Sequence, residues 1–267
     1  MIDCPGAFAG KVAVVSGAGR GLGRFVACGL AARGVRVAAV ARSADQVRET
    51  AELIQAAGGE ALPLAADVSC PLAVEELTRQ VHAKLGDVSL LINAAGVFGP
   101  IQTVAESDSQ RWRETILINT LGPYLLCRAF LPDMLRAGWG RIIQFSSAAS
   151  LHVPGPLNSA YGTSKVALNQ FTRHLAAELA GTEVTACVLH PGEVQTAMWA
   201  AIRDESQPTG EQGAGYRRWV EQVAASGGDS PQKALDLVLA IIARRDTSDN
   251  GKFLWIEGGI QQPIASW

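Results

Sequence analysis

Short apolar segments alternate with longer helical patterns from residue 11 almost to the end of this 267-residue chain, and this alternation limits the fold more than any other feature. Nearly continuous apolar runs are typical of strands that are covered on both faces. Strands joined by helical crossovers form a parallel sheet. We therefore predict an α/β fold with strands at 11–17, 35–41, 60–67, 88–95, 141–147, 183–190 and 252–258, and helices near 21–33, 44–57, 71–85, 108–137, 160–180 and 231–244.

Composition and charge exclude several classes of protein. A hydrophobic share of 48% and a charged share of 18% indicate a globular chain, which we expect to form one domain over residues 1–267. The net charge of −2 provides no basic surface for nucleic acid or anionic lipid. The longest apolar runs are too short to cross a bilayer, and no His, Cys or Asp residues have metal-ligand spacing. We expect no nucleic-acid, membrane or metal partner.

The cysteines and the amino terminus bear on the cellular compartment. Five cysteines, at positions 4, 28, 70, 127 and 187, are widely spaced and include no C-x-x-C motif. The first eleven residues contain an early acid and no apolar segment of signal-peptide length. We therefore expect reduced thiols in a cytoplasmic protein.

Residues 195–230 interrupt the alternation of strands and helices. Their centre, "DESQPTGEQGAG", is polar and rich in glycine, and it separates two stretches that contain aromatic residues. Long insertions in compact domains are usually functional or disordered. We interpret this segment as a lid over a substrate pocket, and the alternative is that its middle is a floppy loop.

A glycine-rich turn follows the first predicted strand. Such a turn, placed before a helix, lets backbone N–H groups approach an anionic phosphate. The spacing here matches neither the G-x-G-x-x-G fingerprint, because Leu22 or Arg24 stands where the third glycine belongs, nor a Walker A loop. A tight turn without a ligand is the alternative interpretation. The candidate phosphate-binding residues are Ser16, Gly17, Gly19, Arg20, Gly21, Leu22 and Gly23.

The end of the second predicted strand bears on cofactor choice. NAD sites usually place an acid there to bind the ribose hydroxyls, whereas an arginine accepts the 2′-phosphate of NADP. Arg42 occupies this position, Arg20 lies in the glycine loop, and the first acid, Asp45, falls inside the next helix. We therefore favour NADP(H), with NAD(H) as the alternative, unless both arginines are ordinary surface residues.

Tyr161 and Lys165 form a candidate catalytic pair within "AYGTSKVALNQF". Four residues apart on a helix, their side chains point the same way. A free tyrosine, with a pKa of about 10, exchanges protons poorly near neutral pH, and a neighbouring cation should lower that pKa. The spacing alone also fits an amphipathic helix with a solvated lysine, so its meaning depends on the other motifs.

Taken together, these motifs resemble those of the short-chain dehydrogenase/reductase family in its single-domain form, over about residues 10–260. The glycines at 17, 21 and 23, "ADVS" with Asp67, "NAAG" at 93–96 and the "PG" turn at 191–192 occur in the family's order. The resemblance implies a Rossmann-type, doubly wound sheet of about seven parallel strands in the order 3-2-1-4-5-6-7, with helices on both faces. It adds as cofactor contacts Asp67, Val68, Asn93, Ala94, Ala95, Gly96, Tyr161, Lys165, Pro191, Gly192, Val194 and Thr196.

The positions of these motifs agree with a physical rule that is independent of the family. Each motif directly follows a predicted strand. In an open parallel sheet the carboxyl ends of the strands form one edge, and ligands bind in the crevice at that edge. The loops should therefore converge on one cleft.

The resemblance also implies a set of catalytic roles. Tyr161 would be the general acid in reduction and the general base in oxidation, and Lys165 would hold the nicotinamide ribose. Ser147 would hydrogen-bond the substrate oxygen, although the interval from Ser147 to Tyr161 is one residue longer than is usual in the family. Asn119 would fix a water molecule that links solvent to the lysine. A strand-end cap and a structural asparagine are the alternatives for Ser147 and Asn119.

The predicted substrate pocket is mostly apolar. His152 and His190 flank it, but no Ser-Asp or Cys arrangement accompanies them, which disfavours hydrolase chemistry. The candidate lining residues are Phe98, Ser147, Leu151, Val153, Leu157, Met198 and Trp199.

The leading hypothesis is a cytoplasmic, NADP(H)-dependent oxidoreductase that interconverts a ketone or aldehyde and an alcohol. The alternatives are an NAD-dependent dehydrogenase that oxidises a polyol, sugar or sterol-like alcohol, and a catalytically silent protein that senses the dinucleotide. By resemblance we expect a homotetramer or homodimer, formed by the helix that carries Tyr161 and by the final helix and strand, within "FLWIEGGIQQPIASW".

Overall fold

The sheet of the computed structural model, which describes residues 8–256 and 259–261, has eight strands in the order β3-β2-β1-β4-β5-β6-β7-β8. The first seven are parallel, which confirms the predicted order. The eighth pairs antiparallel with β7 and was not predicted. The strands are β1 Val12–Ser16, β2 Arg36–Ala41, β3 Ala61–Ala65, β4 Leu90–Asn93, β5 Gly140–Phe145, β6 Val184–His190, β7 Phe253–Trp255 and β8 Gly259–Gln261.

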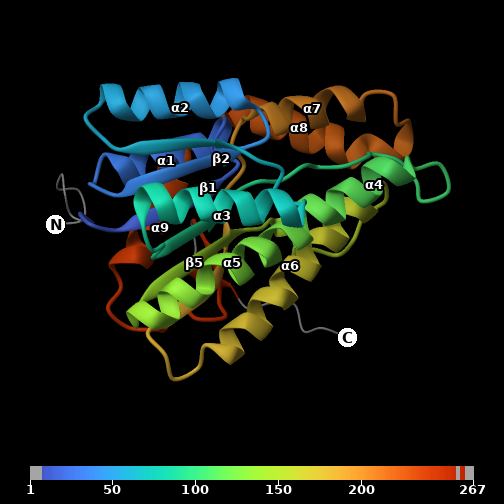
Figure 1. Cartoon of the computed structure of the whole chain (residues 1–267). Helices are drawn as coiled ribbons and strands as arrows, with labels where there is room; N and C mark the ends of the chain where they lie inside the picture. The colour runs from blue at the N-terminus through green and yellow to red at the C-terminus, as the bar shows by residue number, and fades with distance from the viewer. Residues whose placement is uncertain (1–7, 257–258, 262–267) are drawn as a thin grey trace.

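Helices cover both faces of the sheet, as expected for a doubly wound fold. On one face, α1, α2 and α9 pack against the strands through one apolar cluster, and α3, α5 and α6 pack on the other face through a second cluster. Figure 1 shows α3, α5 and α6 in front of the sheet. The helices are α1 Gly21–Ala31, α2 Ala44–Ala56, α3 Pro71–Leu85, α4 Ser109–Ile116, α5 Gly122–Ala137, α6 Ser159–Glu178, α7 Ala197–Ser206, α8 Ala214–Ser226 and α9 Pro231–Ala243.

The central strands are buried along their whole length, which explains their continuous apolar sequences. All five residues of β1 and all seven of β6 are buried. Burial on both faces is the condition under which alternation between apolar and polar residues disappears.

The helix predicted at 108–137 is divided into three parts. α4 ends at Ile116, a π-helical turn, η1, covers Leu117–Leu121, and α5 begins at Gly122. π-Helical turns occur frequently at functional sites. Here the turn contains Asn119, one of the predicted catalytic residues.

Residues 195–230 are mostly helical and form a hairpin, with an irregular connection only in the middle. α7 and α8 lie side by side (Figure 1), joined through a short 3₁₀ turn, η3, at Glu211–Gly213. Ile202 and Val220 pack with Leu157 in a third apolar cluster. The Arg217 guanidinium donates to the main-chain oxygen of Ser206 at 3.0 Å, which braces the polar connection.

Some expectations concern residues outside the described ranges. The first seven residues, on which part of the compartment argument rests, lie outside them, as do 257–258 and 262–267, where part of the subunit contact was predicted. The four described cysteines, at 28, 70, 127 and 187, are free thiols. Among the described residues, no helix has both the length and the apolar character needed to cross a membrane.

Candidate functional site

A cleft of about 660 Å³ runs along the carboxyl edge of the sheet, where the predicted loops converge. It receives residues that follow β1, β2, β3, β4 and β6 in sequence, together with residues of α4, α6 and α7. The predicted cofactor residues that line it are Gly17, Gly19, Arg20, Gly21, Leu22, Gly23, Arg42, Asp67, Val68, Ala94, Ala95, Gly96, Tyr161, Lys165, Pro191 and Thr196.

Four predicted cofactor residues lie elsewhere. Ser16 and Asn93 are 1% and 2% exposed and lie at the ends of β1 and β4, beneath the cleft. The Ser16 hydroxyl accepts a hydrogen bond from the Ala95 main chain at 3.3 Å, so Ser16 positions the loop after β4. Gly192 and Val194 line a neighbouring cavity instead.

Close approach of neighbouring backbone atoms explains why two positions of the loop are glycine. Gly17 has a φ of +73°, and a Cβ there would lie 2.7 Å from the Ala95 nitrogen. A Cβ on Gly23 would lie 2.3 Å from the Gly17 oxygen. Since neither position leaves room for a side chain, the turn brings bare backbone to the start of α1, where N–H groups favour a phosphate. This cradle fits a dinucleotide.

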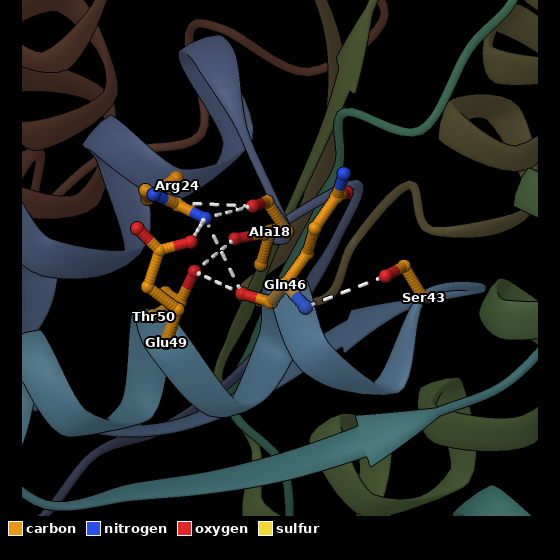
Figure 2. Close-up of polar contacts among 7 residues, drawn as sticks. Ala18, Arg24, Ser43, Gln46, Glu49 and Thr50 are labelled. Carbon is orange, nitrogen blue, oxygen red and sulfur yellow. Dashed lines mark hydrogen bonds and ion pairs between the residues drawn. The ribbon is translucent and has the colours of Figure 1, made fainter.

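The glycine loop is held from one side by α2 (Figure 2). The Arg24 guanidinium donates to the Gly19 carbonyl and pairs with Glu49 at 2.6 Å. The Thr50 hydroxyl, 0% exposed, lies 2.8 Å from the Ala18 carbonyl, to which it donates. Arg24, which breaks the fingerprint in the sequence, therefore replaces the missing glycine with a side chain that supports the loop.

The adenosine end of the cleft carries both signs of charge. Arg42 directly follows β2 and pairs with Glu114 of α4 at 2.7 Å. Arg20 lines the cleft and forms no ion pair with any described residue. Asp67 accepts hydrogen bonds from the main chain and the hydroxyl of Ser69 at 2.9 and 2.7 Å. A 2′-phosphate could therefore bind here, but Arg42 must first exchange its carboxylate partner.

A second cavity of about 570 Å³ adjoins the cleft. Tyr161 lines both cavities, Lys165 lines only the cleft, and Ser147 lines only the second cavity. Three of the four predicted catalytic side chains are thus arranged across the boundary between the larger cleft and the second cavity.

Tyr161 is buried, and burial raises its pKa. A hydrogen bond with Ser147 lowers the pKa by a smaller amount. Ser147 therefore reaches the tyrosine despite the extra residue between them. Lys165 was expected to lower the pKa of Tyr161, but in the protein without a cofactor it does not do so. The Lys165 ammonium lies 5.6 Å from the centre of the Tyr161 ring, and desolvation of the phenolate has the largest effect on the pKa of the tyrosine.

Lys165 is 4% exposed, and burial lowers its pKa to about 8. Its Nζ donates to the Phe145 carbonyl, the last residue of β5, at 2.8 Å. A cation buried with a single neutral partner is costly, so the site favours an additional acceptor for the ammonium.

Asn119 connects the cleft to the catalytic helix. Its Oδ1 accepts from the Val97 nitrogen at 2.9 Å, and its Nδ2 donates to the Val97 oxygen at 2.8 Å and to the Ser164 hydroxyl at 3.0 Å. Ser164 in turn donates to the Tyr161 carbonyl at 2.7 Å. The asparagine thus has side-chain and main-chain partners, and it ties the loop after β4 to α6.

Most of the predicted substrate residues line the second cavity: Phe98, Ser147, Val153, Met198 and Trp199. Leu151 and Leu157 do not line it. Leu157 turns into the third apolar cluster with a φ of +69°. Glu193, Tyr216 and Trp219 also line this cavity and were not among the predicted substrate residues. The aromatic residues of the "YRRWVEQV" stretch could have indicated the last two.

Aromatic rings form much of the cavity wall. The Phe98 ring lies 4.6 Å from that of Tyr161, and Tyr216 contacts Phe98 edge to face at 6.0 Å. Three buried atoms of other lining residues have no hydrogen-bond partner among the described groups: Asn158 Oδ1, His190 Nδ1 and Trp199 Nε1.

One cluster of possible metal ligands lies on the opposite side of the sheet from α1 and was not predicted. His82, Asp87 and Asp133 place ligand atoms within 4.8 Å of one another. Arg136 pairs with both carboxylates, at 3.0 and 2.9 Å, and His82 lies 2.7 Å from Asp133. Because Arg136 already compensates the carboxylates, the cluster is explained as an ion-pair network.

Comparison with known proteins agrees with this geometry. A family model described as short chain dehydrogenase matches residues 11–207. A short chain dehydrogenase of Pseudocercospora fijiensis is 39% identical over 207 residues, which span 76% of this chain but only 66% of that relative, just under two thirds of its length. The 3-oxoacyl-(acyl-carrier-protein) reductase of Escherichia coli is 30% identical over 95% of this chain and 98% of its own.

A solved structure is similar over nearly the whole chain. The crystal structure of a metagenomic short-chain oxidoreductase in complex with NADP has a TM-score of 0.73 and 31% identity, and the match covers 91% of this chain and 96% of that one.

Replacing Thr50 by Val tests the support of the glycine loop. The change keeps the shape of the side chain but removes the donor to Ala18, so we expect the free energy of unfolding to fall by about 1–3 kcal/mol. Thr78→Val is the matched control, because the Thr78 hydroxyl donates only within α3, to Val74. Urea denaturation measures both variants, and equal losses would contradict a special role for Thr50.

Lys165→Met tests how much the buried ammonium lowers the free energy of unfolding. Lowering a pKa from 10.5 to about 8 corresponds to a destabilisation of at most about 3 kcal/mol at neutral pH, partly offset by the bond to Phe145. The cost is fully present below pH 8 and is relieved as the pH rises toward 10.5. The wild type should therefore gain stability relative to Lys165→Met between pH 8 and 10.5.

Thermal unfolding at pH 7 and pH 10 measures this difference. Lys84→Met, at an exposed position of α3, should show no such pH dependence. A stability difference between wild type and Lys165→Met that stays constant over this range would show that the lysine is not desolvated.

Proposed function

The chain belongs to the short-chain dehydrogenase/reductase family, and we propose that it is an NADP(H)-dependent oxidoreductase that interconverts a ketone or aldehyde and an alcohol. The observation that carries this proposal is the position of Tyr161 in the wall between two cavities, with Lys165 on one side and Ser147 on the other. A proton donor in that wall reaches groups bound in either cavity.

The larger cleft suits the dinucleotide. When bound, the nicotinamide supplies or accepts the hydride. Gly17 and Gly23 leave room for a phosphate, Asp67 offers a carboxylate oxygen to the adenosine, and Lys165 offers an ammonium to ribose hydroxyls. The metagenomic relative that binds NADP supports this assignment.

The chain's own residues would handle the proton. The Ser147 hydroxyl donates a hydrogen bond to the carbonyl oxygen of the substrate and orients it. Tyr161 donates its phenolic proton to the same oxygen as negative charge develops there. Lys165 then stabilises the phenolate by Coulomb attraction, because an opposite charge nearby favours the ionised form. In oxidation Tyr161 takes the proton back.

Burial of Tyr161 suits the phenol to the role of proton donor. Since its pKa is raised, the phenol carries its proton at neutral pH and is ready to donate it. The aromatic wall favours a substrate that is largely apolar.

The second candidate is an NAD-dependent dehydrogenase. It is favoured by the ion pair between Arg42 and Glu114, which occupies the arginine that would bind a 2′-phosphate. The wild-type preference between the two dinucleotides decides between these candidates.

Two further proposals concern the lid over the substrate cavity and the oligomeric state. We propose that the α7–α8 hairpin acts as a lid over the substrate cavity, because Trp199 and Trp219 line that cavity from its two helices.

We also propose a cytoplasmic homodimer or homotetramer. The outer faces of α5 and α6 expose Tyr124 and Val166, 43% and 50% accessible, and this supports a subunit contact through α6.

Tyr161→Phe should abolish turnover and preserve dinucleotide binding. Loss of the phenolic proton donor in the dividing wall should lower kcat by about 10²–10⁴-fold, whereas the NADPH dissociation constant should change less than about twofold because the ring remains. Ketone reduction followed at 340 nm and NADPH fluorescence measure the two effects. Tyr124→Phe, on the exposed face of α5, is the control, and a Tyr161→Phe enzyme that retains wild-type kcat would refute the mechanism.

Substitutions at the adenosine end of the cleft test the preference between NADPH and NADH. Arg42→Asp should weaken NADPH binding by about tenfold or more and shift preference toward NADH, because it replaces a charge-assisted partner of the phosphate with a repelling charge. Glu114→Gln should instead tighten NADPH binding several-fold by releasing Arg42.

Initial rates with NADPH and with NADH give the NADPH-to-NADH ratio of the Arg42→Asp variant and that of the Glu114→Gln variant. Arg48→Asp, at an exposed position of α2 where Asp45 is the ion-pair partner of the arginine within residues 8–256, controls for general loss of positive charge. An unchanged NADPH-to-NADH ratio in Arg42→Asp would remove the argument for NADP.

A further inference from the structure

Charge is distributed unequally between the two cavities. The nucleotide cleft is lined by four cationic side chains, Arg20, Arg42, Arg111 and Lys165, and by three carboxylates, Asp67, Glu114 and Glu205. Arg42 pairs there with Glu114 and Arg111 with Glu205, so the described lining has one more positive than negative charge. Among the described residues, neither a lysine nor an arginine lines the substrate cavity, and its one carboxylate is that of Glu193.

The other titratable groups of this cavity do not offset that carboxylate at neutral pH. Burial lowers the pKa of His190 to about 4 and raises that of Tyr216 to about 12, so both are neutral. The Tyr161 pKa is also raised. His152 lines the cavity from an exposed position. The cavity is therefore a negatively charged environment.

Glu193 is held in place on the wall. It lies three residues beyond the end of β6, and its Oε1 accepts a hydrogen bond from Trp219 Nε1 of α8 at 2.7 Å. Its main-chain nitrogen donates to Asp229 at 2.8 Å, and Asp229 is paired with Lys233 at 2.9 Å. Glu193 has no ion-pair partner among the described residues, so its charge remains available to a ligand.

The aromatic side chains of the cavity wall favour the same ligand charge as the Glu193 carboxylate does. Trp199, Tyr216, Trp219 and Phe98 line the cavity, and the Arg203 guanidinium lies 5.5 Å from the centre of the Trp199 ring. The faces of aromatic rings attract cations and do not attract anions.

We propose that Glu193 is a specificity-determining residue, through which the substrate cavity accepts neutral or amine-bearing aromatic carbonyl compounds and rejects carboxylates and phosphates. This inference rests on the proposed function, because it assigns a substrate class to the same cavity. It excludes substrates whose binding depends on an anionic group close to the reacting carbonyl.

Three nearly isosteric ketones test the proposal: 4-acetylbenzamidine, 4-acetylbenzamide and 4-acetylbenzoate. They differ mainly in charge, which is positive, zero and negative at pH 8. Dissociation constants are measured by isothermal titration calorimetry with saturating NADP⁺, which cannot reduce a ketone, so the readout does not depend on turnover. The wild type should bind the amidine roughly three- to tenfold more tightly than the amide, and the benzoate more weakly by a similar factor.

Glu193→Gln is the decisive variant, because its amide oxygen still accepts from Trp219 while the charge is lost. In this variant the three constants should agree within about twofold. In the wild type, 1 M salt should reduce the discrimination, since the Debye length falls to about 3 Å. Glu221→Gln removes an exposed carboxylate from α8 outside the cavity and should behave as wild type.

The proposal is overturned if Glu193→Gln keeps the wild-type ranking, if the benzoate binds more tightly than the amide, or if none of the three compounds binds. The proposed function fails separately, if the ranking is observed but NADPH reduces none of the compounds that bind.

Discussion

The site depends on the close approach of two backbones at the ends of β1 and β4. Because Gly17 has no side chain, the glycine loop rests directly on the loop after β4. From there, hydrogen bonds run through Asn119 and Ser164 to the main chain of Tyr161. The phosphate cradle and the proton donor are thus parts of one connected framework, and a disturbance of the glycine turn would displace both.

The sequence allowed the sheet and most helices to be predicted because their signals are local. Burial on both faces leaves a continuous apolar run that is visible within a few residues, as in β6. The α7–α8 hairpin could not be predicted in the same way. Its apolar residues Ile202 and Val220 pack against Leu157, so its stability depends on a contact between segments far apart in the sequence. The π-helical turn around Asn119 likewise has no local signature.

The site was predictable where it depends on topology and less so where it depends on loop conformation. Residues that directly follow parallel strands meet at one edge, which explains why Gly17, Arg42 and Asp67 line one cleft. Leu151 and Leu157 lie in a loop whose course the sequence does not determine, and neither lines the substrate cavity. The spacing of Tyr161 and Lys165 indicated their proximity but not their burial, which dominates the pKa of both.

The wall between the two cavities has a consequence for engineering this protein. Leu22, Phe98, Thr196 and Met198 line both cavities, as Tyr161 does. A substitution at one of these positions alters cofactor and substrate recognition together, so its two effects are coupled. Arg42 lines only the larger cleft, and Glu193 lines only the second cavity. Given the roles proposed for Arg42 and Glu193, cofactor preference and substrate charge are separable traits, which can be redesigned independently and then combined.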